Sequence, residues 1–455
     1  MKINGVTMRG SAGALTEDNK LKPEDGAAHD WFRFVLSFPP HLVRDYLERF
    51  GVSKRQTVLD PFCGTGTTLV ECKKRGIPSL GIEANPSVHF ASQTKLRWDV
   101  DSVGLVRHAR RVAESTLNVL ESQGFHTESD LPLFGDSNGR GNGTALRTLP
   151  PEVMKLLLAD SISTVPLHKT LVLLDILEKK KDSNYWDHER LALAQTLVFE
   201  TSNLHFGPEV GVRRQKKTDA PVVSAWLRAV TNIAADLREL ADLTRVGSTV
   251  YLGDARDLRD FLEPTSIDTV ITSPPYPNEK DYTRTTRLES VLLGFLKNKD
   301  DLRRLKYDLV RSNTRGVYKA DNDDQFIRGH KEIERIAKEI EERRIELGKT
   351  SGFERLYGRV TKLYFGGMAK HLSQLREVLR PGAHLAYVVG DQASYLRIMI
   401  RTGRLLADIA QSLGYDVEGI DLFRTRLSTA TKEQLREEVV VLRWPGAHKR
   451  SRFKK

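Results

Sequence analysis

The sequence predicts an α/β fold built on a doubly wound, mostly parallel sheet that two insertions interrupt. Residues 57–60 and 79–85 are apolar runs separated by a Gly-containing turn and a helix, which is the pattern of a βαβ unit. Apolar runs that end in polar residues resume at 248–255 and 267–276. The stretch from about 87 to 245 is helical in pattern and too long for one crossover, so it indicates an insertion.

The N-terminal elements follow from composition and spacing. Residues 1–28 are polar and are predicted to form a flexible arm. The first part of the α/β domain is assigned to 29–100. Its first helix, over 41–50, follows two prolines, which a helix tolerates at its first turn. The helix after the first strand is predicted to end at Gly76.

The first insertion is assigned to residues 101–245 and is predicted to be a helical subdomain. Apolar residues recur there at helical spacing, and a Gly/Asn-rich loop lies at 137–143. Its helices are predicted at 101–123, 151–160, 166–181, 188–199 and 221–245.

The rest of the chain alternates between domain and insertion. The α/β domain resumes at 246–280, and a charged, mostly helical insertion is assigned to 281–365, with a solvated helix at 332–347. Residues 366–446 complete the domain, and 447–455 form a basic tail. The closing elements are predicted as helices at 365–379 and 398–413, a strand at 383–390, and an antiparallel pair at 416–424 and 437–445.

Composition narrows the function classes. The 455 residues carry 71 Lys and Arg against 60 Asp and Glu, a net charge of +11, which suits a polyanionic partner such as nucleic acid. A merely soluble basic protein is the alternative. Two cysteines exclude a disulfide scaffold and a four-cysteine zinc site within one chain. No apolar leader or run of about 18 apolar residues occurs, so a cytoplasmic location without membrane association is expected.

The first motif, DPFCGTGTT, begins at Asp60, just beyond the first strand. Its glycines allow backbone to approach a ligand closely. The lysine of a phosphate-binding loop is missing, as is a GxGxxG fingerprint, so the motif favours a ligand without phosphates. Glu83, at the end of the next strand, is positioned to accept hydrogen bonds from ribose hydroxyls. A purely structural turn is the alternative.

The second motif, TSPPY, follows the strand at 267–276. Two prolines stiffen the loop and leave carbonyl groups free to accept hydrogen bonds. Ser273 adds a hydroxyl and Tyr276 an aromatic face, a combination that suits a planar base with an exocyclic amine. A rigid turn with a core tyrosine is the alternative.

Together these motifs resemble the amino-methylating DNA methyltransferases, which use S-adenosyl-L-methionine. GIEANP, YLGDARD and FPPHLV are similar to further cofactor segments of that family. The resemblance implies a Rossmann-like class I methyltransferase sheet, a catalytic loop of Ser273, Pro274, Pro275 and Tyr276, and double-stranded DNA as substrate. It also implies cofactor contacts from Phe38, Pro39, Asp60, Pro61, Phe62, Cys63, Gly64, Thr65, Gly66, Thr67, Glu83, Ala84, Asp254 and Ala255.

The resemblance implies direct methyl transfer to a flipped base, and several alternatives stay open. Ser rather than Asp before the two prolines favours cytosine N4 over adenine N6. An RNA N-methyltransferase and a non-catalytic DNA-binding module are further alternatives. A carbon-5 cytosine enzyme is rejected, because neither Cys63 nor Cys72 lies in a Pro-Cys loop. A restriction or defence-system partner is implied by the family alone.

Basic residues in both insertions are candidates for contact with DNA. For each candidate arginine, a solvated helix face is the competing interpretation. Asp391 follows a strand and is interpreted as structural, and the scattered His29, His41, His205 and His371 predict no metal site. The candidates for DNA contact are Arg284, Arg287, Arg303, Arg304, Arg311 and Arg315 in the charged insertion, and Arg213, Arg214, Lys216 and Lys217 in the helical one.

Overall fold

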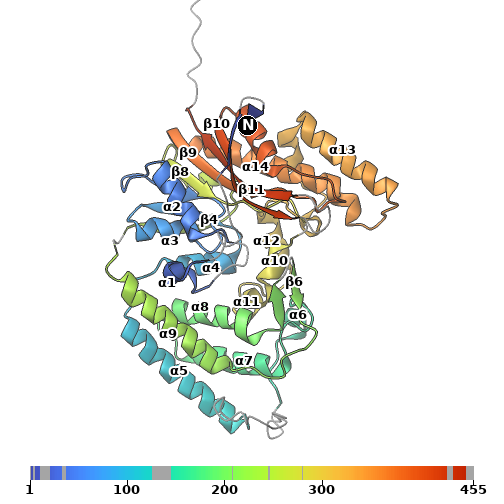
Figure 1. The fold of residues 1–455 in the computed structure, drawn as a ribbon. Helices are drawn as coiled ribbons and strands as arrows, with labels where there is room; N and C mark the ends of the chain where they lie inside the picture. Colours follow the sequence, from blue (N-terminus) through green and yellow to red (C-terminus); the bar gives the residue numbers. More distant parts are fainter. Residues whose placement is uncertain are drawn as a thin grey trace, which may run out of the picture.

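The computed structural model describes residues 2–3, 6–10, 21–32, 37–125, 145–206, 209–243, 246–278, 280–427 and 434–446. These residues contain one nine-stranded sheet, in the order β1-β2-β10-β11-β9-β8-β3-β4-β7. Helices cover both of its faces, and a separate group of helices forms the lower half of the molecule in Figure 1. The predicted α/β class with a doubly wound sheet and helical insertions is confirmed.

The central strands run parallel and carry the two motifs at their carboxyl ends. They are β3 (Val58–Asp60), β4 (Ser79–Glu83), β7 (Ser248–Leu252), β8 (Ile267–Thr272) and β9 (Leu379–Gly390). Beyond β9, β11 (Gln434–Arg443) pairs antiparallel with both β9 and β10 (Asp416–Leu427), which confirms the predicted closing pair.

The N-terminal segment differs from the flexible arm predicted for residues 1–28. β1 (Lys2–Ile3) and β2 (Val6–Gly10) extend the sheet, and β2 pairs in parallel with β10. Edge pairing uses backbone N–H and C=O groups, so the polar composition of the segment did not reveal it. η2 (Pro23–Asp25) and α1 (Gly26–His29) follow. The rest of the predicted arm lies outside the described residues.

Side chains alternate between two cores across the sheet. On β9, Leu385, Tyr387 and Val389 pack against one set of helices, while Ala386 and Val388 face the other. The first set is α13 (Lys331–Glu346), α14 (Tyr357–Val378) and α15 (Thr402–Ser412), and the second is α2 (Pro40–Arg49) and α3 (Thr67–Lys74).

The lower group of helices has a core of its own that continues into the α/β part. Buried residues of α5, α7, α8 and α9 share one cluster with Leu69 of α3 and Ala91 of α4. The helix α6, Pro151–Met154, is shorter than the helix predicted at 151–160. The hairpin of β5 (Leu204–Phe206) and β6 (Val210–Val212) was not predicted. The bounds are α4 (Pro86–Lys95), α5 (Ser102–Ser122), α6 (Pro151–Met154), α7 (Thr164–Lys179), α8 (Trp186–Thr196), η3 (Leu197–Thr201), β5 (Leu204–Phe206), β6 (Val210–Val212) and α9 (Val222–Leu240).

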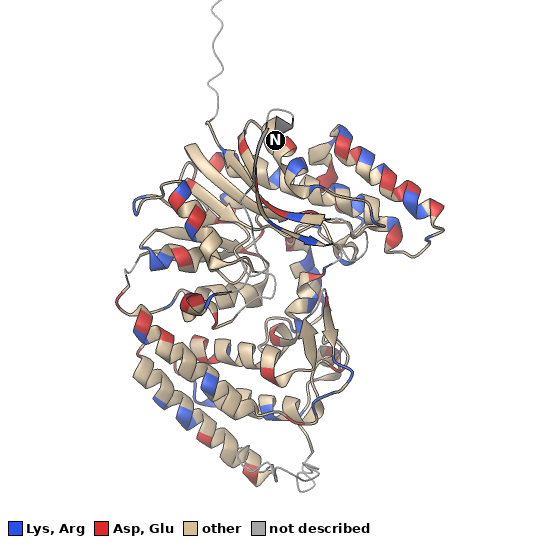
Figure 2. Ribbon diagram, in the orientation of Figure 1, with Lys and Arg blue, Asp and Glu red and all other residues tan. Residues whose placement is uncertain are grey.

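The charged stretch after β8 begins with short helices and turns, of which Leu288 and Leu292 pack in the core of the lower helices, and it continues into the longer α13. Oppositely charged side chains alternate along α13, as Figure 2 shows, and Arg335 pairs with both Glu332 and Glu339. α14 begins at 357, inside the range predicted for this insertion. The preceding bounds are η4 (Leu258–Asp260), α10 (Tyr282–Thr285), α11 (Arg287–Leu292), α12 (Lys299–Asp308), η5 (Thr314–Gly316), η6 (Asp323–Ile327) and η7 (Glu354–Leu356).

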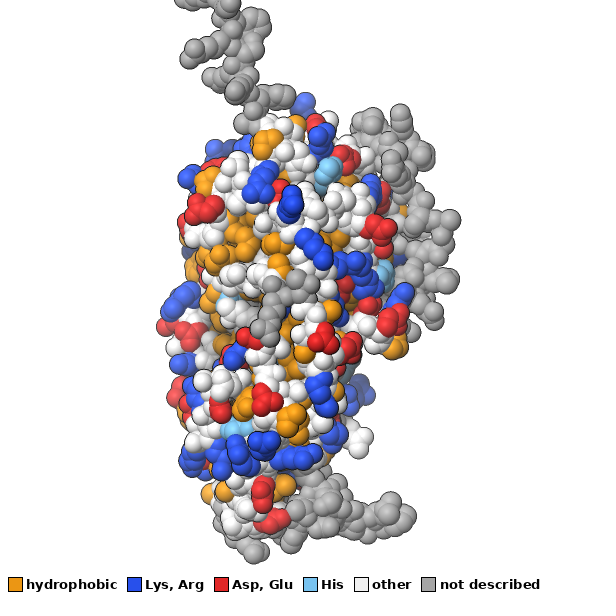
Figure 3. Space-filling view, turned by 90° about the vertical axis from the view of Figure 1, so that its left-hand side faces the viewer, with side chains coloured by type: hydrophobic (Ala, Val, Ile, Leu, Met, Phe, Trp, Pro, Cys, Tyr) orange, Lys and Arg blue, Asp and Glu red, His pale blue; other side chains and the backbone are white. Residues whose placement is uncertain are grey.

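Surface charge is distributed unevenly. In the side view of Figure 3, Lys and Arg side chains gather in a band across the lower part of the molecule, over the helical group. Within the described residues, no helix combines the length and the apolar character that a membrane span requires.

Candidate active site

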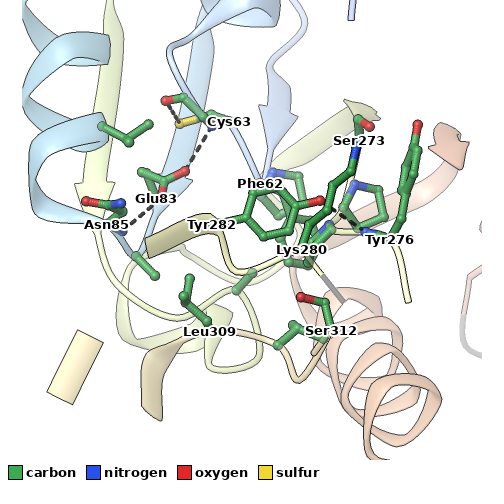
Figure 4. Close-up of a pocket in the computed structure, with 18 of the residues that line it drawn as sticks. Phe62, Cys63, Glu83, Asn85, Ser273, Tyr276, Lys280, Tyr282, Leu309 and Ser312 are labelled. Atoms are coloured by element: carbon green, nitrogen blue, oxygen red, sulfur yellow. Dashed lines mark hydrogen bonds between the residues drawn. The ribbon is translucent and has the colours of Figure 1, made fainter. Parts of the chain in front are cut away.

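A cavity of about 370 Å³ lies beyond the carboxyl ends of β3, β4, β7 and β8. In Figure 4, Cys63, Glu83 and Asn85 lie on one side of this cavity and Ser273, Tyr276 and Lys280 on the other. Both predicted motifs therefore line one space. The predicted residues that line it are Phe38, Pro61, Phe62, Cys63, Gly64, Thr65, Thr67, Glu83, Ala84, Asp254, Ala255, Ser273, Pro274, Pro275 and Tyr276.

The glycine-containing loop between β3 and α3 has a backbone that requires glycine. Gly66 precedes α3 with a φ of 84°, and a Cβ there would lie 2.7 Å from Ser92 Oγ. A side chain at this position would therefore be strained and would collide with α4. Gly66 and Pro39 are not among the residues that line the cavity.

Asp60 is also predicted to bind cofactor, but its side chain is fully buried between β3 and β8. Its Oδ1 accepts hydrogen bonds from Thr272 Oγ1 at 2.6 Å and from the Phe62 N–H at 3.2 Å. Burial raises the pKa of Asp60 to about 6, against the effect of the Thr272 hydroxyl. Asp60 therefore stabilises the loop between β3 and α3 through the Phe62 N–H and is not among the residues that line the cavity.

Glu83 supports the loop from the cavity side. Its Oε2 accepts from the Gly64 N–H at 3.0 Å, and its Oε1 accepts from the Asn85 N–H at 2.8 Å. Burial raises the pKa of Glu83 to about 7, although both backbone N–H groups favour the ionised form. Each oxygen retains capacity for one further hydrogen bond from a ligand.

Asp254 lines the cavity after β7 with its carboxylate held by Arg256. The Arg256 guanidinium contacts both Asp254 oxygens, with the shortest distance 2.6 Å between Nη2 and Oδ2. Both side chains are largely buried. The carboxylate is therefore fixed in orientation where it meets the cavity.

The TSPPY loop presents its polar groups to the opposite side. Ser273 Oγ donates to the Val388 carbonyl oxygen at 3.1 Å, which engages the hydroxyl hydrogen. The oxygen also lies within hydrogen-bond reach of the Tyr276 side chain and keeps acceptor capacity for a ligand. The Tyr276 N–H donates to Tyr282 Oη at 3.4 Å. A Cβ on Gly390 would lie 2.9 Å from Tyr276 Cε2, so the bare strand end of β9 makes room for the ring.

A third part of the cavity wall was missed at the sequence level. Residues of the charged insertion close the cavity, and side chains from the β10–β11 hairpin also line it, including the ion pair of Arg424 with Glu437. Lys280 and Asp281 line the cavity four and five residues after Tyr276, and this closeness in the chain to the TSPPY loop was the available signal. The insertion residues that line the cavity are Lys306, Asp308, Leu309, Val310, Arg311, Ser312, Asn313 and Gly316.

The predicted DNA-contact arginines include both buried and exposed side chains. Arg287 is buried and bonds to Thr283 and the Leu156 carbonyl, while Arg311 is buried against Asp321, so both are structural. Arg303, Arg304, Arg213 and Arg214 are exposed.

His371 is buried between the Ala255 carbonyl oxygen and Tyr387 Oη, and burial lowers its pKa to about 4. Asp391 is buried and paired with Arg401.

Comparison with known proteins agrees with the motifs. The N6_N4_Mtase family, described as DNA methylase, matches residues 15–93. The chain is 26% identical over 457 residues to type II methyltransferase M.BsoBI of Geobacillus stearothermophilus, covering 91% of this chain and 84% of that protein. It is 25% identical over 463 residues to type II methyltransferase M.AvaI of Anabaena variabilis, covering 94% and 88%.

Among solved structures, TrmN from Thermus thermophilus aligns with a TM-score of 0.24 at 11% identity, covering 89% of this chain and 48% of that one. This alignment is too weak to support an argument. The sequence comparisons confirm the predicted resemblance to amino-methylating DNA methyltransferases of the type II class.

Proposed function

From this similarity to type II amino-methylating DNA methyltransferases, we propose that the protein methylates the exocyclic N4 amine of a cytosine flipped out of duplex DNA, using S-adenosylmethionine. The observation that carries the proposal is the single cavity lined by the Gly64 loop and Glu83 on one side and by Ser273 and Tyr276 on the other. One space of this kind brings a donor and an acceptor of a methyl group together.

The chemistry of the cavity fits the proposed cofactor. Each Glu83 oxygen, already held by one backbone N–H, accepts one ribose hydroxyl. Asp254, oriented by Arg256, accepts from the adenine amine. The Gly64 loop approaches the methionine part without side-chain obstruction. When bound, the cofactor would supply an electrophilic methyl group on a sulfonium and would leave as S-adenosylhomocysteine, so the protein itself needs no nucleophile. The methylated amine then releases one proton.

The TSPPY loop then activates the target amine. Ser273 Oγ and the Pro274 carbonyl accept the two amine hydrogens, which draws the conjugated nitrogen toward tetrahedral geometry and exposes its lone pair. Ser273 is suited to accept because its own hydrogen is donated to Val388. Stacking on Tyr276 offsets part of the cost of flipping the base, a few kcal/mol.

Adenine N6 is the second candidate, because the matched family covers both amines. A hydroxyl in place of a carboxylate at position 273 favours the cytosine reading. Because M.BsoBI and M.AvaI are type II methyltransferases, we also propose a cognate restriction endonuclease as a partner in the cell.

The test is transfer of tritium from labelled S-adenosylmethionine to mixed-sequence duplex DNA, followed by mass analysis of the nucleosides. Label in N4-methylcytosine is the expected result. Label in N6-methyladenine would show that the target base is adenine and would leave the proposed mechanism unchanged. Label in RNA but not in DNA would overturn the substrate, and a protein that binds cofactor and DNA without transfer would favour a non-catalytic module.

A further inference from the structure

Arg256 connects three parts of the chain that are distant in sequence. Its guanidinium is bidentate on Asp254, and its Nη1 donates to Asp323 Oδ2 at 2.6 Å. Its Nη2 also donates to the Tyr307 carbonyl oxygen at 2.7 Å. Asp254 belongs to the proposed cofactor end of the cavity, whereas Tyr307 and Asp323 belong to the charged insertion. The Arg256 side chain is only 8% exposed, so these bonds are sheltered from water.

The insertion segment that Arg256 holds forms the cavity wall near the TSPPY loop. Tyr307 precedes Asp308 to Asn313, which line the cavity directly. Lys306 in the same stretch pairs with Asp281 at 3.2 Å, five residues beyond Tyr276. The position of this wall therefore affects the space available to a base stacked beside Tyr276.

The fit between the insertion and the sheet domain depends on two small residues. A Cβ on Gly366 would lie 2.1 Å from the Asp323 carbonyl oxygen, and one on Gly367 would lie 3.2 Å from Asp323 Oδ2. The turn that carries Asp323 is thus seated directly on the backbone of α14. A second arginine, Arg311, braces the same wall through a bidentate pair with Asp321, at 2.9 and 2.8 Å. Among the described residues, the Arg311 guanidinium bonds to Asp321 and to carbonyl oxygens of residues 306–309, and not to Asp254.

We propose that Arg256 is a positioning residue that couples occupancy of the cofactor end of the cavity to the order of the 306–316 wall, through its bonds to the Tyr307 carbonyl oxygen and to Asp323. A ligand that fixes the Asp254 carboxylate also fixes the guanidinium bound to it, and with it Asp323 and the Tyr307 carbonyl. Coupling of this kind is reciprocal, so an ordered wall also strengthens binding at Asp254. The proposal rests on the proposed function for its ligand, the adenosyl group.

The structure offers a matched pair of variants. Asp321 and Asp323 are two residues apart, and each pairs with one largely buried arginine. Only the arginine of Asp323 contacts Asp254. Asp323→Asn and Asp321→Asn therefore each weaken one arginine pair that braces the wall, but only Asp323→Asn removes a carboxylate bound to Arg256, which then keeps the Tyr307 carbonyl as its contact with the insertion.

The experiment measures backbone hydrogen exchange of residues 306–316 with and without saturating S-adenosylhomocysteine, in the full chain. We expect the ligand to slow exchange of this segment at least about threefold in the unsubstituted protein and in Asp321→Asn. In Asp323→Asn the slowing is reduced, because only the Tyr307 carbonyl still connects Arg256 to the insertion, although calorimetry shows the ligand bound. Asp323→Glu, which keeps the carboxylate, restores part of the slowing. Thermal melting of each variant, together with Asp323→Glu, covers the case in which Asp323→Asn does not fold.

The outcomes separate this inference from the function on which it rests. Bound S-adenosylhomocysteine with no response of 306–316 in the unsubstituted protein would overturn the coupling and leave the methyltransferase assignment intact. Equal slowing of exchange in Asp323→Asn and Asp321→Asn would mean that Arg256 stabilises the fold without transmitting ligand binding to residues 306–316. Failure of the unsubstituted protein to bind S-adenosylhomocysteine would overturn the cofactor assignment, and the coupling with it.

Discussion

At the scale of single residues, the hydroxyl of Ser273 is expected to act on the amine and not on the cofactor. Ser273→Ala removes one of the two acceptors that draw the amine toward tetrahedral geometry, so kcat should fall about 10²-fold. The dissociation constant of S-adenosylhomocysteine should stay within about twofold, because Ser273 lies on the opposite side of the cavity from Glu83. Single-turnover methyl transfer and calorimetry measure the two quantities. Equal losses in both would contradict the role assigned to Ser273.

Glu83 is expected to make binding of the proposed cofactor sensitive to pH near neutrality. Burial places its pKa at about 7 in the free protein, and a protonated carboxyl accepts ribose hydroxyls less well than a carboxylate. Affinity for S-adenosylhomocysteine should therefore rise about tenfold between pH 6 and pH 8, as the ionised fraction rises. In Glu83→Gln the affinity should be low and nearly constant over this range. A pH dependence that survives in Glu83→Gln would assign the titration to another group.

At the scale of elements, the end of β9 lies against the Tyr276 ring of the TSPPY loop. In Gly390→Ala the added methyl group overlaps the Tyr276 ring and displaces it, so methyl transfer should fall about tenfold or more while cofactor affinity is preserved. The strand itself should stay intact, since Gly390 has no positive φ that only glycine adopts.

A double-mutant cycle gives the control for Gly390. In a Tyr276→Ala background there is no ring to displace, so Gly390→Ala should cost little further activity. Additive losses would show that Gly390→Ala acts elsewhere than on Tyr276. Steady-state methylation of mixed-sequence duplex DNA measures all four proteins of the cycle.

Some of the strands and helices could be predicted from the sequence, and others could not. The strands β3, β4, β8 and β9 and the long helices were predictable because apolar spacing and terminal glycines are local signals. The β5–β6 hairpin was missed because each strand has three residues, too few for an alternating pattern. The motif residues were predicted to share a site because together they resemble the amino-methylating DNA methyltransferases, and the parallel strands do bring their carboxyl ends together. The wall at 306–316 was missed, because its place over the cavity depends on distant contacts such as Arg256 with Asp323.

At the scale of the whole molecule, the two groups of helices and the sheet form a continuous structure. Trp31, nearly fully buried, donates from its Nε1 to Asp236 of α9 at 2.8 Å, and Leu69 and Ala91 pack in the core of the lower helices. The proposed helical insertion at 101–245 therefore covers apolar surface of the α/β part.

Replacing residues 101–245 with a short linker is expected to yield an aggregated protein. The apolar faces of α3 and α4 would become exposed as a contiguous patch, which soluble monomers avoid. Size-exclusion chromatography beside the full chain measures this. A monomeric deletion variant that still binds S-adenosylhomocysteine would show that the region is an independent domain.

At the edge of the sheet, the directions of the strands bring two segments that are distant in sequence close together. Because β2 runs parallel to β10 and β11 antiparallel to it, the start of β2 and the end of β11 lie at the same end of the sheet, separated by one strand. A short peptide can bridge that distance, and new termini can be opened in a surface loop without breaking the core. Such a circular permutant would place TSPPY ahead of DPFCGTGTT while keeping the same cavity. The architecture thus leaves the linear order of its two motifs open to rearrangement during evolution.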